Sequence, residues 1–290
     1  MKQAVAIGNM DGVHPGHQAL IEAAKATGLM PTVLTFEPHP RQVFAPEKAP
    51  FRLQTKAQKV ATLRSLGIER VAVVPFSRDF AAQSAKAFVE DLLIGHLNAG
   101  AVIVGEDFRF GQSREGDIAT LQAYDFDVKI IPPVEDEVGL AFSSTRIRAA
   151  IAEGDMEAAN RLLGRPWVIE GEVFKGQQLG RTIGIPTANI LLGDYQRPPY
   201  GIFAAWVIVK DKRWPSAMYL GKRPTVQGQD EWLEAFLLDF DGDLYGQTIT
   251  VEPVTMIRPD QAFDGIDALK AQMDRDIAAI RALLLDNAAP

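Results

Sequence analysis

The chain has 290 residues, of which 47% are hydrophobic and 23% are charged, and its formal net charge is −7. This composition is typical of a folded protein with one large or two ordinary domains. The acidic balance argues against a general nucleic-acid-binding or membrane-surface protein, because both bind through a basic face. The absence of cysteine excludes disulfides and thiolate zinc sites, and it favours a reducing compartment.

The ends and the hydropathy of the chain predict its location. The N-terminus enters a strand pattern directly, without the basic and apolar regions of a signal peptide. No stretch approaches the roughly 20 apolar residues of a membrane span. We therefore expect a cytoplasmic protein without a membrane anchor.

As far as about residue 165, short apolar strands alternate with helical patterns. The predicted strands are 4–7, 32–36, 71–75, 101–104 and 128–131, and the predicted helices include 55–66, 85–97, 145–152 and 156–163. Strands separated by helices of this length pair in parallel through right-handed crossovers. The pattern predicts an α/β domain with a doubly wound parallel sheet.

After Gly164-Arg165-Pro166 the strand patterns follow one another without helices between them. They cover residues 167–174, 204–209, 216–220, 233–240 and 248–255, and turns rich in Gly and Pro separate them. This spacing is typical of an antiparallel β-barrel. An amphipathic helix over 260–285 would pack on it. We therefore predict two domains, residues 1–165 and 166–290.

The first predicted strand leads into a helix that begins with His14-Pro15-Gly16-His17. A helix N-terminus offers unpaired amides and a positive dipole, and two imidazoles there favour a polyphosphate ligand. A lone histidine at this place is often only a cap, and a metal site has little support because no carboxylates share the spacing. The surrounding residues, which let the backbone approach a ligand closely, are Gly8, Asp11, Gly12 and Gly16.

A second loop-to-helix junction carries Ser143, Ser144, Thr145 and Arg146, followed by Arg148. Hydroxyls at a helix start are usually plain N-caps. Two arginines in the same turn favour a second phosphate site, because the guanidinium fork matches phosphate oxygens.

Both of these sites offer donors and positive charge, and neither offers an obvious general base. This fits a nucleophile that is already an anion. If a phosphate oxygen attacks the α-phosphate of ATP and expels pyrophosphate, catalysis needs only positioning and charge stabilisation. Adenylyl transfer to a phosphate ester is the inferred chemistry.

Two further segments follow the carboxyl ends of predicted strands, where open α/β sheets bind ligands. The first contains His39 and Pro40, and the second contains Asp107, Phe108 and Arg109. Each segment is also readable as a stiff connecting loop. The aromatic and charged residues of the second segment favour the wall of a pocket for a flat ring.

The second half opens with a glycine-rich segment that contains Gly176, Gly180 and Arg181. Such a segment can bring amides to phosphates, although a mobile hairpin has the same composition. Thr187 and Asn189 follow at positions i and i+2, on one face of an extended segment. Their neutral oxygens suit Mg²⁺ together with substrate phosphates, and a plain turn is the alternative.

Glu234 alternates with apolar residues in a predicted strand. Most carboxylates in that setting are simply solvated. In this chain Glu234 would supply what the first site lacks, which is a base that can deprotonate an alcohol.

Taken together and in order, these motifs resemble the bacterial bifunctional riboflavin kinase/FAD synthetase family. In the first half the matching segments are 8–17, 35–40, 104–111 and 143–148. In the second half they are 180–181, 186–189, 199–201, 221–225 and 239–246. The first segment alone is shared by many nucleotidyltransferases, whereas the ordered set is highly specific.

The resemblance implies two reactions that use ATP. A kinase would phosphorylate riboflavin to FMN, with Thr187 and Asn189 at the metal and the phosphates and Glu234 as the base. A synthetase would adenylylate FMN to FAD, with His14, His17 and residues 143–146 at the ATP phosphates. Residues 39–40 and Asp107 would shape the nucleotide or flavin pocket. Neither a nucleic acid nor an obligate protein partner is expected.

Three departures from the family pattern leave alternatives open. Met10 stands where Phe is usual, Phe236 where His is common, and Val226-Gln227-Gly228 where Phe-Gly-Gly is usual. One alternative is therefore a monofunctional FMN adenylyltransferase whose barrel binds flavin with little turnover. The others are a nucleic-acid-binding barrel, which would need a basic face, and a different phosphate-bearing acceptor for the first domain.

Overall fold

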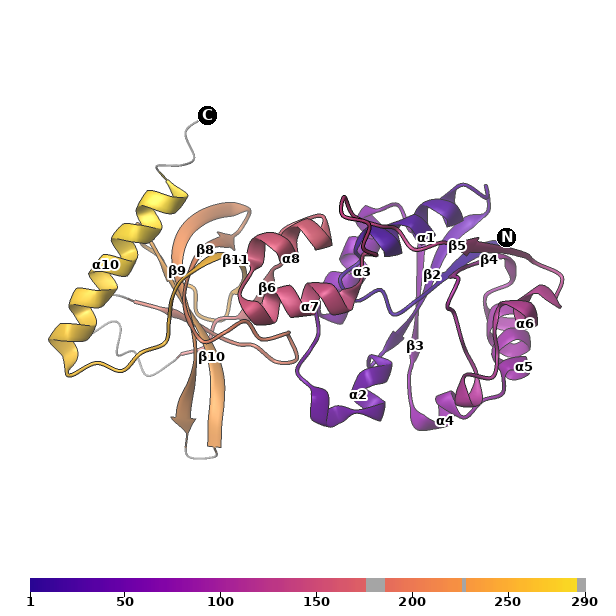
Figure 1. Cartoon of the computed structure of the whole chain (residues 1–290), viewed down its shortest axis with the longest axis horizontal. Helices are drawn as coiled ribbons and strands as arrows, with labels where there is room; N and C mark the ends of the chain where they lie inside the picture. Colours follow the sequence, from indigo (N-terminus) through magenta and orange to yellow (C-terminus); the bar gives the residue numbers. More distant parts are fainter. Residues whose placement is uncertain (176–185, 226–227, 286–290) are drawn as a thin grey trace. The chain divides into compact units, whose positions relative to one another are not determined.

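The computed structural model describes residues 1–175, 186–225 and 228–285 (Figure 1). The chain forms two compact units. Unit 1 contains Met1–Arg146 and Leu162–Gly164, and unit 2 contains Ile147–Arg161 and Arg165–Pro290. The predicted domain boundary at 165/166 remains a prediction. Within the described ranges, no helix is both long and apolar enough to span a membrane.

Unit 1 is built on a five-stranded parallel sheet with the strand order β3-β2-β1-β4-β5. The strands are β1 (Gln3–Ile7), β2 (Met30–Glu37), β3 (Arg70–Pro75), β4 (Ala99–Gly105) and β5 (Asp127–Ile131). All five predicted strands and the doubly wound class are confirmed. Because β1 and β2 advance in one direction across the sheet and β4 lies on the other side of β1, the order reverses between β1 and β4. Open α/β sheets bind ligands at such a reversal.

Helices cover both faces of this sheet (Figure 1). Val5 and Ile7 of β1 face the helical stretch that contains Val89, whereas Ala4 and Ala6 face α1 and α3. This alternation follows from the two-residue period of a strand, which sends successive side chains to opposite faces. The helices of unit 1 are α1 (Pro15–Lys25), α2 (Pro40–Phe44), α3 (Lys56–Ser65), α4 (Arg78–Ala81), α5 (Ala85–Ala87), the π-helix η2 (Phe88–His96) and α6 (Ile118–Gln122), with 3₁₀ turns η1 (Pro46–Lys48) and η3 (Gln112–Arg114). The helix α7 (Ser144–Glu153) begins in unit 1 and continues in unit 2.

Unit 2 contains a six-stranded antiparallel sheet with the order β6-β11-β8-β9-β10-β7. A bridge from Phe174, whose N–H donates to Asn189 O at 2.9 Å, joins its two ends and closes a barrel. The predicted barrel class is therefore confirmed. The elements are α8 (Met156–Leu163), β6 (Ile169–Glu172), β7 (Ala188–Leu191), β8 (Gly201–Val209), β9 (Lys212–Thr225), β10 (Gly228–Leu237), β11 (Thr248–Pro259) and α10 (Ile266–Leu284).

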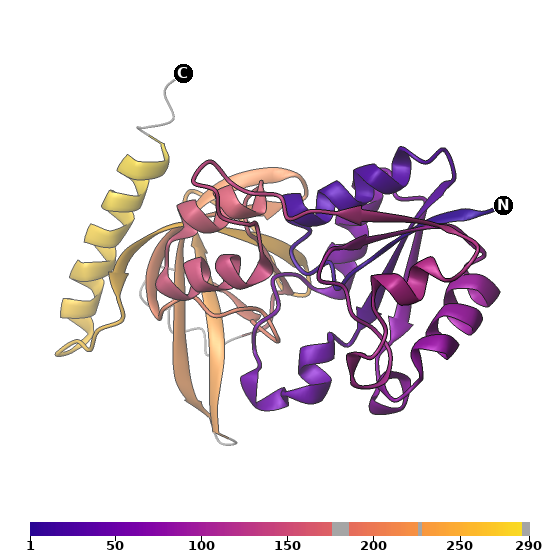
Figure 2. The same cartoon turned by 45° about the vertical axis from the view of Figure 1, so that its right-hand side comes forward.

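The helix α10 lies along one side of the barrel (Figure 2). Ile280 and Leu284 pack against Ala204 of β8 and Leu238, in a cluster that also includes Phe236. Several predicted boundaries differ here, and two of them have a clear backbone cause. The predicted strand 233–240 ends at Leu237, because Asp239 turns the chain with a φ of 58°. The predicted helix 260–285 begins only at Ile266, after Gly265, which has a φ of 100°.

Candidate active sites in the two units

The predicted histidine pair lies where the β1–α1 loop enters α1. His14 is the N-cap residue and only 6% exposed, and its ring stacks on that of His17 with a centroid separation of 3.8 Å. A Cβ on Gly16 would lie 3.1 Å from His14 Cε1, so a glycine here leaves room for the imidazole. No side chain caps the helix in the described residues. Pro15 has no N–H and the N–H of His17 donates to His14 O at 2.8 Å, so Gly16 is the first-turn residue whose N–H stays available to an anion.

The loop before this helix has an unusual backbone. Met10, Gly12 and Val13 have φ angles of 53°, 89° and 44°. Positive φ is costly for a β-branched residue such as Val13, and such strain persists only where the surroundings hold it. Asp11 provides one anchor, because its buried carboxylate accepts hydrogen bonds from the N–H groups of Leu53 and Gln54. The Asp11 side chain therefore attaches the loop to the backbone of Leu53 and Gln54.

A buried ionic cluster lies against the same loop. Glu37, at the end of β2, accepts two hydrogen bonds from Arg52 at 2.7 and 2.9 Å and is 2.6 Å from Lys59 Nζ. Burial raises the pKa of Glu37, but the bonds from Arg52 and Lys59 outweigh it and hold that pKa below its usual range. Burial also lowers the pKa of Lys59, which Glu37 only partly offsets. The sequence did not predict this cluster, because a lysine in a helix normally indicates a solvated face.

The segment 143–146 meets the β1–α1 loop. Ser144 Oγ donates to Asp11 O at 2.7 Å across 133 residues of sequence, and Ser143 Oγ caps α7 by accepting from Arg146 N. Thr145 is exposed.

The guanidinium of Arg146 is held by the loop 134–142. It donates to the carbonyls of Leu140 and Ala141 at 2.9 Å each and to Asp136 Oδ2 at 2.5 Å. The bond from Arg146, followed by those from the amides of Leu140 and Val138, holds the pKa of Asp136 below its usual range. Arg146 thus fastens a loop that follows β5 to the start of α7.

A pocket of about 790 Å³ opens at the carboxyl ends of β1, β2 and β4, and this volume lies within the range of small-molecule sites. Its walls are rich in aromatic side chains. The phenylalanines that line it are Phe36, Phe44, Phe76, Phe80, Phe88, Phe108 and Phe110. Phe108 and Phe110 stack with centroids 5.5 Å apart. Flat apolar walls of this kind suit a planar aromatic ligand.

The structure brings most of the predicted pocket residues together. Pro40, Asp107, Phe108 and Arg109 all line this pocket, as does Gly8, which was predicted at the phosphates. His39 does not line it; it is buried at the N-cap of α2, where its Nδ1 accepts from Arg41 N at 3.1 Å. The sequence analysis missed the phenylalanines of β2, α4 and η2, although 15 phenylalanines against 5 tyrosines in the chain was a usable indication of an aromatic pocket.

The second predicted site assembles in unit 2. Thr187 Oγ1 donates to Glu234 Oε2 at 3.2 Å, and Asn189 is paired with Glu234 in the β7–β10 register. Glu234 is 8% and Asn189 is 5% exposed. Two segments 47 residues apart therefore place a hydroxyl, an amide and a carboxylate on one face of the barrel sheet.

The donor set of this site fits the predicted cation. Asn189 Nδ2 donates to Thr187 O at 3.2 Å, but its buried Oδ1 has no hydrogen-bond partner in the described residues. A buried carbonyl oxygen without a donor is costly, and a hard cation would satisfy it. Within the same residues, no group of three or more His, Cys, Asp or Glu side chains could hold a metal. A metal bound here would take its remaining ligands from substrate phosphates and water.

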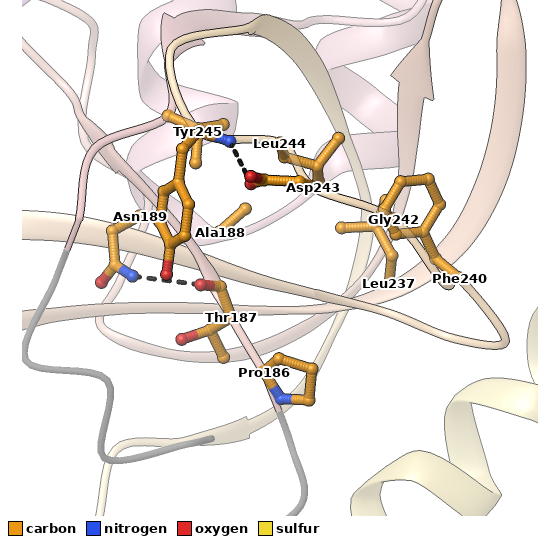
Figure 3. Close-up of a pocket in the computed structure, with 11 residues that line it drawn as sticks. Pro186, Thr187, Ala188, Asn189, Leu237, Phe240, Gly242, Asp243, Leu244 and Tyr245 are labelled. Atoms are coloured by element: carbon orange, nitrogen blue, oxygen red, sulfur yellow. Dashed lines mark hydrogen bonds between the residues drawn. The ribbon is translucent and has the colours of Figure 1, made fainter.

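Thr187 and Asn189 line a small pocket with residues from the chain after β10 (Figure 3). The chain after β10 contributes Phe240, Asp243 and Tyr245 to this pocket. Lys175 Nζ lies 5.6 Å from the centroid of the Tyr245 ring. The glycine-rich segment with Gly176, Gly180 and Arg181 lies outside the described residues, as does Gln227. Phe236 lies on the same strand face as Glu234 and packs against the α10 cluster, so the aromatic ring has a structural partner.

Two family models match this chain. The model described as FAD synthetase matches residues 1–146, and the model described as riboflavin kinase matches residues 163–284. Three curated relatives carry the name bifunctional riboflavin kinase/FMN adenylyltransferase. The Escherichia coli K12 protein is 43% identical (93% of this chain, 89% of the relative), that of Pseudomonas fluorescens 41% (97% and 93%) and that of Bacillus subtilis 37% (95% and 90%).

The whole fold also matches a solved structure. A crystal structure from Streptococcus pneumoniae, described as that of a macrolide-efflux protein, superposes with a TM-score of 0.85 at 33% identity. The match covers 97% of this chain and 94% of that one.

Proposed function

Because the chain belongs to the bifunctional riboflavin kinase/FMN adenylyltransferase family, we propose that its two activities reside in the two sites described above. The enzyme phosphorylates riboflavin to FMN with ATP, and it adenylylates FMN to FAD with release of pyrophosphate. We assign the adenylyltransferase to residues 1–165 and the kinase to residues 166–290. We also assign the enzyme to the cytoplasm, which the cysteine-free sequence supports.

In the kinase, the terminal ribityl hydroxyl attacks the γ-phosphorus of ATP and ADP leaves. The hydroxyl is a weak nucleophile, so a base must accept its proton as the new P–O bond forms. Glu234 is the carboxylate that contacts Thr187, and the bond from Thr187 Oγ1 fixes one carboxylate oxygen in place. The contact between Thr187 and Glu234 is the observation that carries this assignment.

Thr187 and Asn189 would hold Mg²⁺ together with the ATP phosphates. The buried Oδ1 of Asn189 and the hydroxyl of Thr187 are the supporting donors. Bound there, the cation would supply charge neutralisation at the transferred phosphoryl group. The phosphate-binding role predicted for Gly176, Gly180 and Arg181 stays a prediction.

In the adenylyltransferase, an oxygen of the FMN phosphate attacks the α-phosphorus of ATP and pyrophosphate leaves. The nucleophile is already an anion, so this step needs no general base. The helix N-terminus, both imidazoles and the β1–α1 loop (residues 8–13, called the phosphate loop below) would bind the phosphates of ATP. Ser143 and Ser144 would complete this site, and Arg146 would act by holding the loop 134–142 against it.

The phenylalanine-lined pocket would bind the flavin ring of FMN. Its position at the sheet reversal places Gly8 and Asn9 of the phosphate loop on its wall. A flavin whose ring lies among Phe76, Phe80 and Phe108 would therefore extend its phosphate toward the loop. Asp107 and Arg109 provide the polar edge of this pocket.

A time course with purified protein, riboflavin, ATP and Mg²⁺ tests this function. Chromatography should show FMN first and FAD later. FMN supplied directly should be converted to FAD, and its failure to convert would contradict the adenylyltransferase assignment. A protein that converts FMN but leaves riboflavin unchanged would instead be the monofunctional alternative, which the assembled Thr187–Glu234 site does not favour.

A further inference from the structure

Lys59 lies on α3 and is completely buried, although its side chain ends in an ammonium group. Its Nζ lies 3.1 Å from Asn9 O, 3.1 Å from Thr35 Oγ1, 3.4 Å from Phe36 O and 2.6 Å from Glu37 Oε1. Burial of an ammonium group is costly unless each of its protons finds an acceptor. The acceptors here come from β2 and from the phosphate loop.

The carbonyl of Asn9 is the point where this cluster reaches the phosphate loop. It accepts from Lys59 Nζ and also from Thr35 Oγ1, at 2.9 Å. In a trans peptide the carbonyl and the following N–H point in opposite directions. Two buried donors on Asn9 O therefore direct the N–H of Met10 away from the cluster, and no acceptor for that N–H is present in the described residues.

The backbone at this point does not adopt its conformation by default. Met10 and Val13 both have positive φ, a region that side chains with a Cβ rarely occupy. Non-glycine residues in such conformations persist where neighbouring contacts over-determine them. Lys59 and Thr35 supply those contacts at Asn9, and Asp11 supplies them two residues later.

Resting on the adenylyltransferase assignment, we propose that Lys59 is a positioning residue, which turns the Met10 amide toward the ATP phosphates by holding the carbonyl of Asn9. Lys59 itself does not contact the substrate. Its charge is balanced by Glu37, which Arg52 also binds, so the cation is retained in the core. Bound ATP would accept a hydrogen bond from the N–H of Met10. Without Lys59, the loop would not hold this N–H in the required direction.

The test compares Lys59→Met with Leu63→Ala in the full-length enzyme. Both residues lie on α3 and are fully buried, but Leu63 packs in the apolar core that includes Met10 and Val13, and its side chain has no donor for Asn9 O. Each variant is assayed for FMN adenylylation, for riboflavin phosphorylation and for thermal unfolding. The kinase reaction of unit 2 reports the amount of active protein in the same sample.

Lys59→Met should lower kcat for adenylylation by about 100-fold, which is the usual effect of losing one donor to a developing anion. The KM for FMN should stay within twofold, because the flavin pocket is untouched, and kinase turnover should be unchanged. Leu63→Ala should retain adenylylation per folded molecule. Lys59→Arg, which keeps a cation that can donate to Asn9 O, should recover part of the rate.

Equal loss of adenylylation per folded molecule in Lys59→Met and Leu63→Ala would overturn the proposal, as would a wild-type rate in Lys59→Met. If Lys59→Met does not fold, Thr35→Val removes the other donor to Asn9 O and should by itself lower kcat, with the KM for FMN unchanged. A wild-type rate in that variant would also overturn it. If the unmodified enzyme makes no FAD from FMN, the adenylyltransferase assignment itself fails.

Discussion

Thr187 directly precedes β7, Glu234 lies on the neighbouring strand β10, and the hydroxyl of Thr187 donates to one carboxylate oxygen of Glu234 at 3.2 Å. The bond orients a buried carboxylate on the residue that pairs with Asn189, whose Oδ1 has no donor in the described residues. A base and a metal-binding group are thus held on one face by strand pairing. Their relative position depends on the β7–β10 register, since a shift by one residue would send Glu234 to the opposite face.

Glu234→Gln should abolish use of riboflavin and spare use of FMN. The amide keeps the shape of the side chain but does not accept the hydroxyl proton, so phosphorylation should fall by about 10²- to 10⁴-fold. Chromatography with each flavin as substrate measures both reactions. Glu231→Gln is the matched control, since Glu231 lies on the opposite face of β10 and pairs with Arg197. A Glu234→Gln enzyme that still phosphorylates riboflavin would rule out the general base role.

Asn189→Ala should raise the Mg²⁺ concentration that the kinase needs for half-maximal rate by about tenfold or more, as losses in metal-site support generally do. The reason is that the variant removes the buried oxygen Oδ1, which has no protein donor in the described residues. The measurement is a Mg²⁺ titration of riboflavin phosphorylation at saturating ATP. The Mg²⁺ dependence of FMN adenylylation in the same sample is the control and should not move. An unchanged kinase titration would show that Asn189 does not support the metal.

His17→Ala should stop FAD formation while FMN accumulates. The change removes one of two stacked imidazoles at the N-terminus of α1, where the phosphate charge is expected to develop. A loss of about 100-fold or more in adenylylation is expected for a donor of this kind. His96→Ala, at an exposed histidine at the end of η2, controls for loss of an imidazole. Equal FAD production by the two variants would contradict a role for His17 in adenylylation.

Phe108→Ala should raise the KM for FMN in adenylylation and leave the KM for riboflavin in phosphorylation unchanged. Phe108 stacks on Phe110 in the pocket wall, and its loss removes a flat surface for the flavin ring. Stacking of an aromatic pair contributes about 0.5–1.5 kcal/mol beyond area burial, so a change of several-fold in KM is expected. Phe126→Ala removes an equally half-buried ring of unit 1 that does not line the pocket. An unaltered KM for FMN in Phe108→Ala would place the flavin elsewhere.

The sequence predicted the strands of unit 1 because each is a short apolar run between helices, and it predicted the Thr187–Asn189 pair because its spacing suits one face of a strand. It could not predict the buried ions. The sequence pattern around Lys59 indicates a solvated helix residue, because its contacts with Glu37 and the Asn9 carbonyl form only in the folded chain. Arg146 was predicted at the phosphates from its residue type, whereas its partners at 136–141 depend on how a loop folds back, which no local pattern encodes. The strand end at Leu237 depended on the positive φ of Asp239, and Asp is not diagnostic of that conformation.

Arg146→Ala should loosen the loop 134–142 and lower FAD synthesis less severely than His17→Ala does. The guanidinium joins the carbonyls of Leu140 and Ala141 to the carboxylate of Asp136, and a planar fork can serve these acceptors together. Hydrogen exchange should therefore accelerate at residues 134–142 in the variant, while exchange in unit 2 strands such as β8 stays the same. Arg146→Lys should restore the exchange protection only in part, because a single ammonium group lacks the fork. If Arg146→Ala instead abolishes FAD synthesis with unchanged exchange in the loop, Arg146 acts on the phosphates directly and not through the loop.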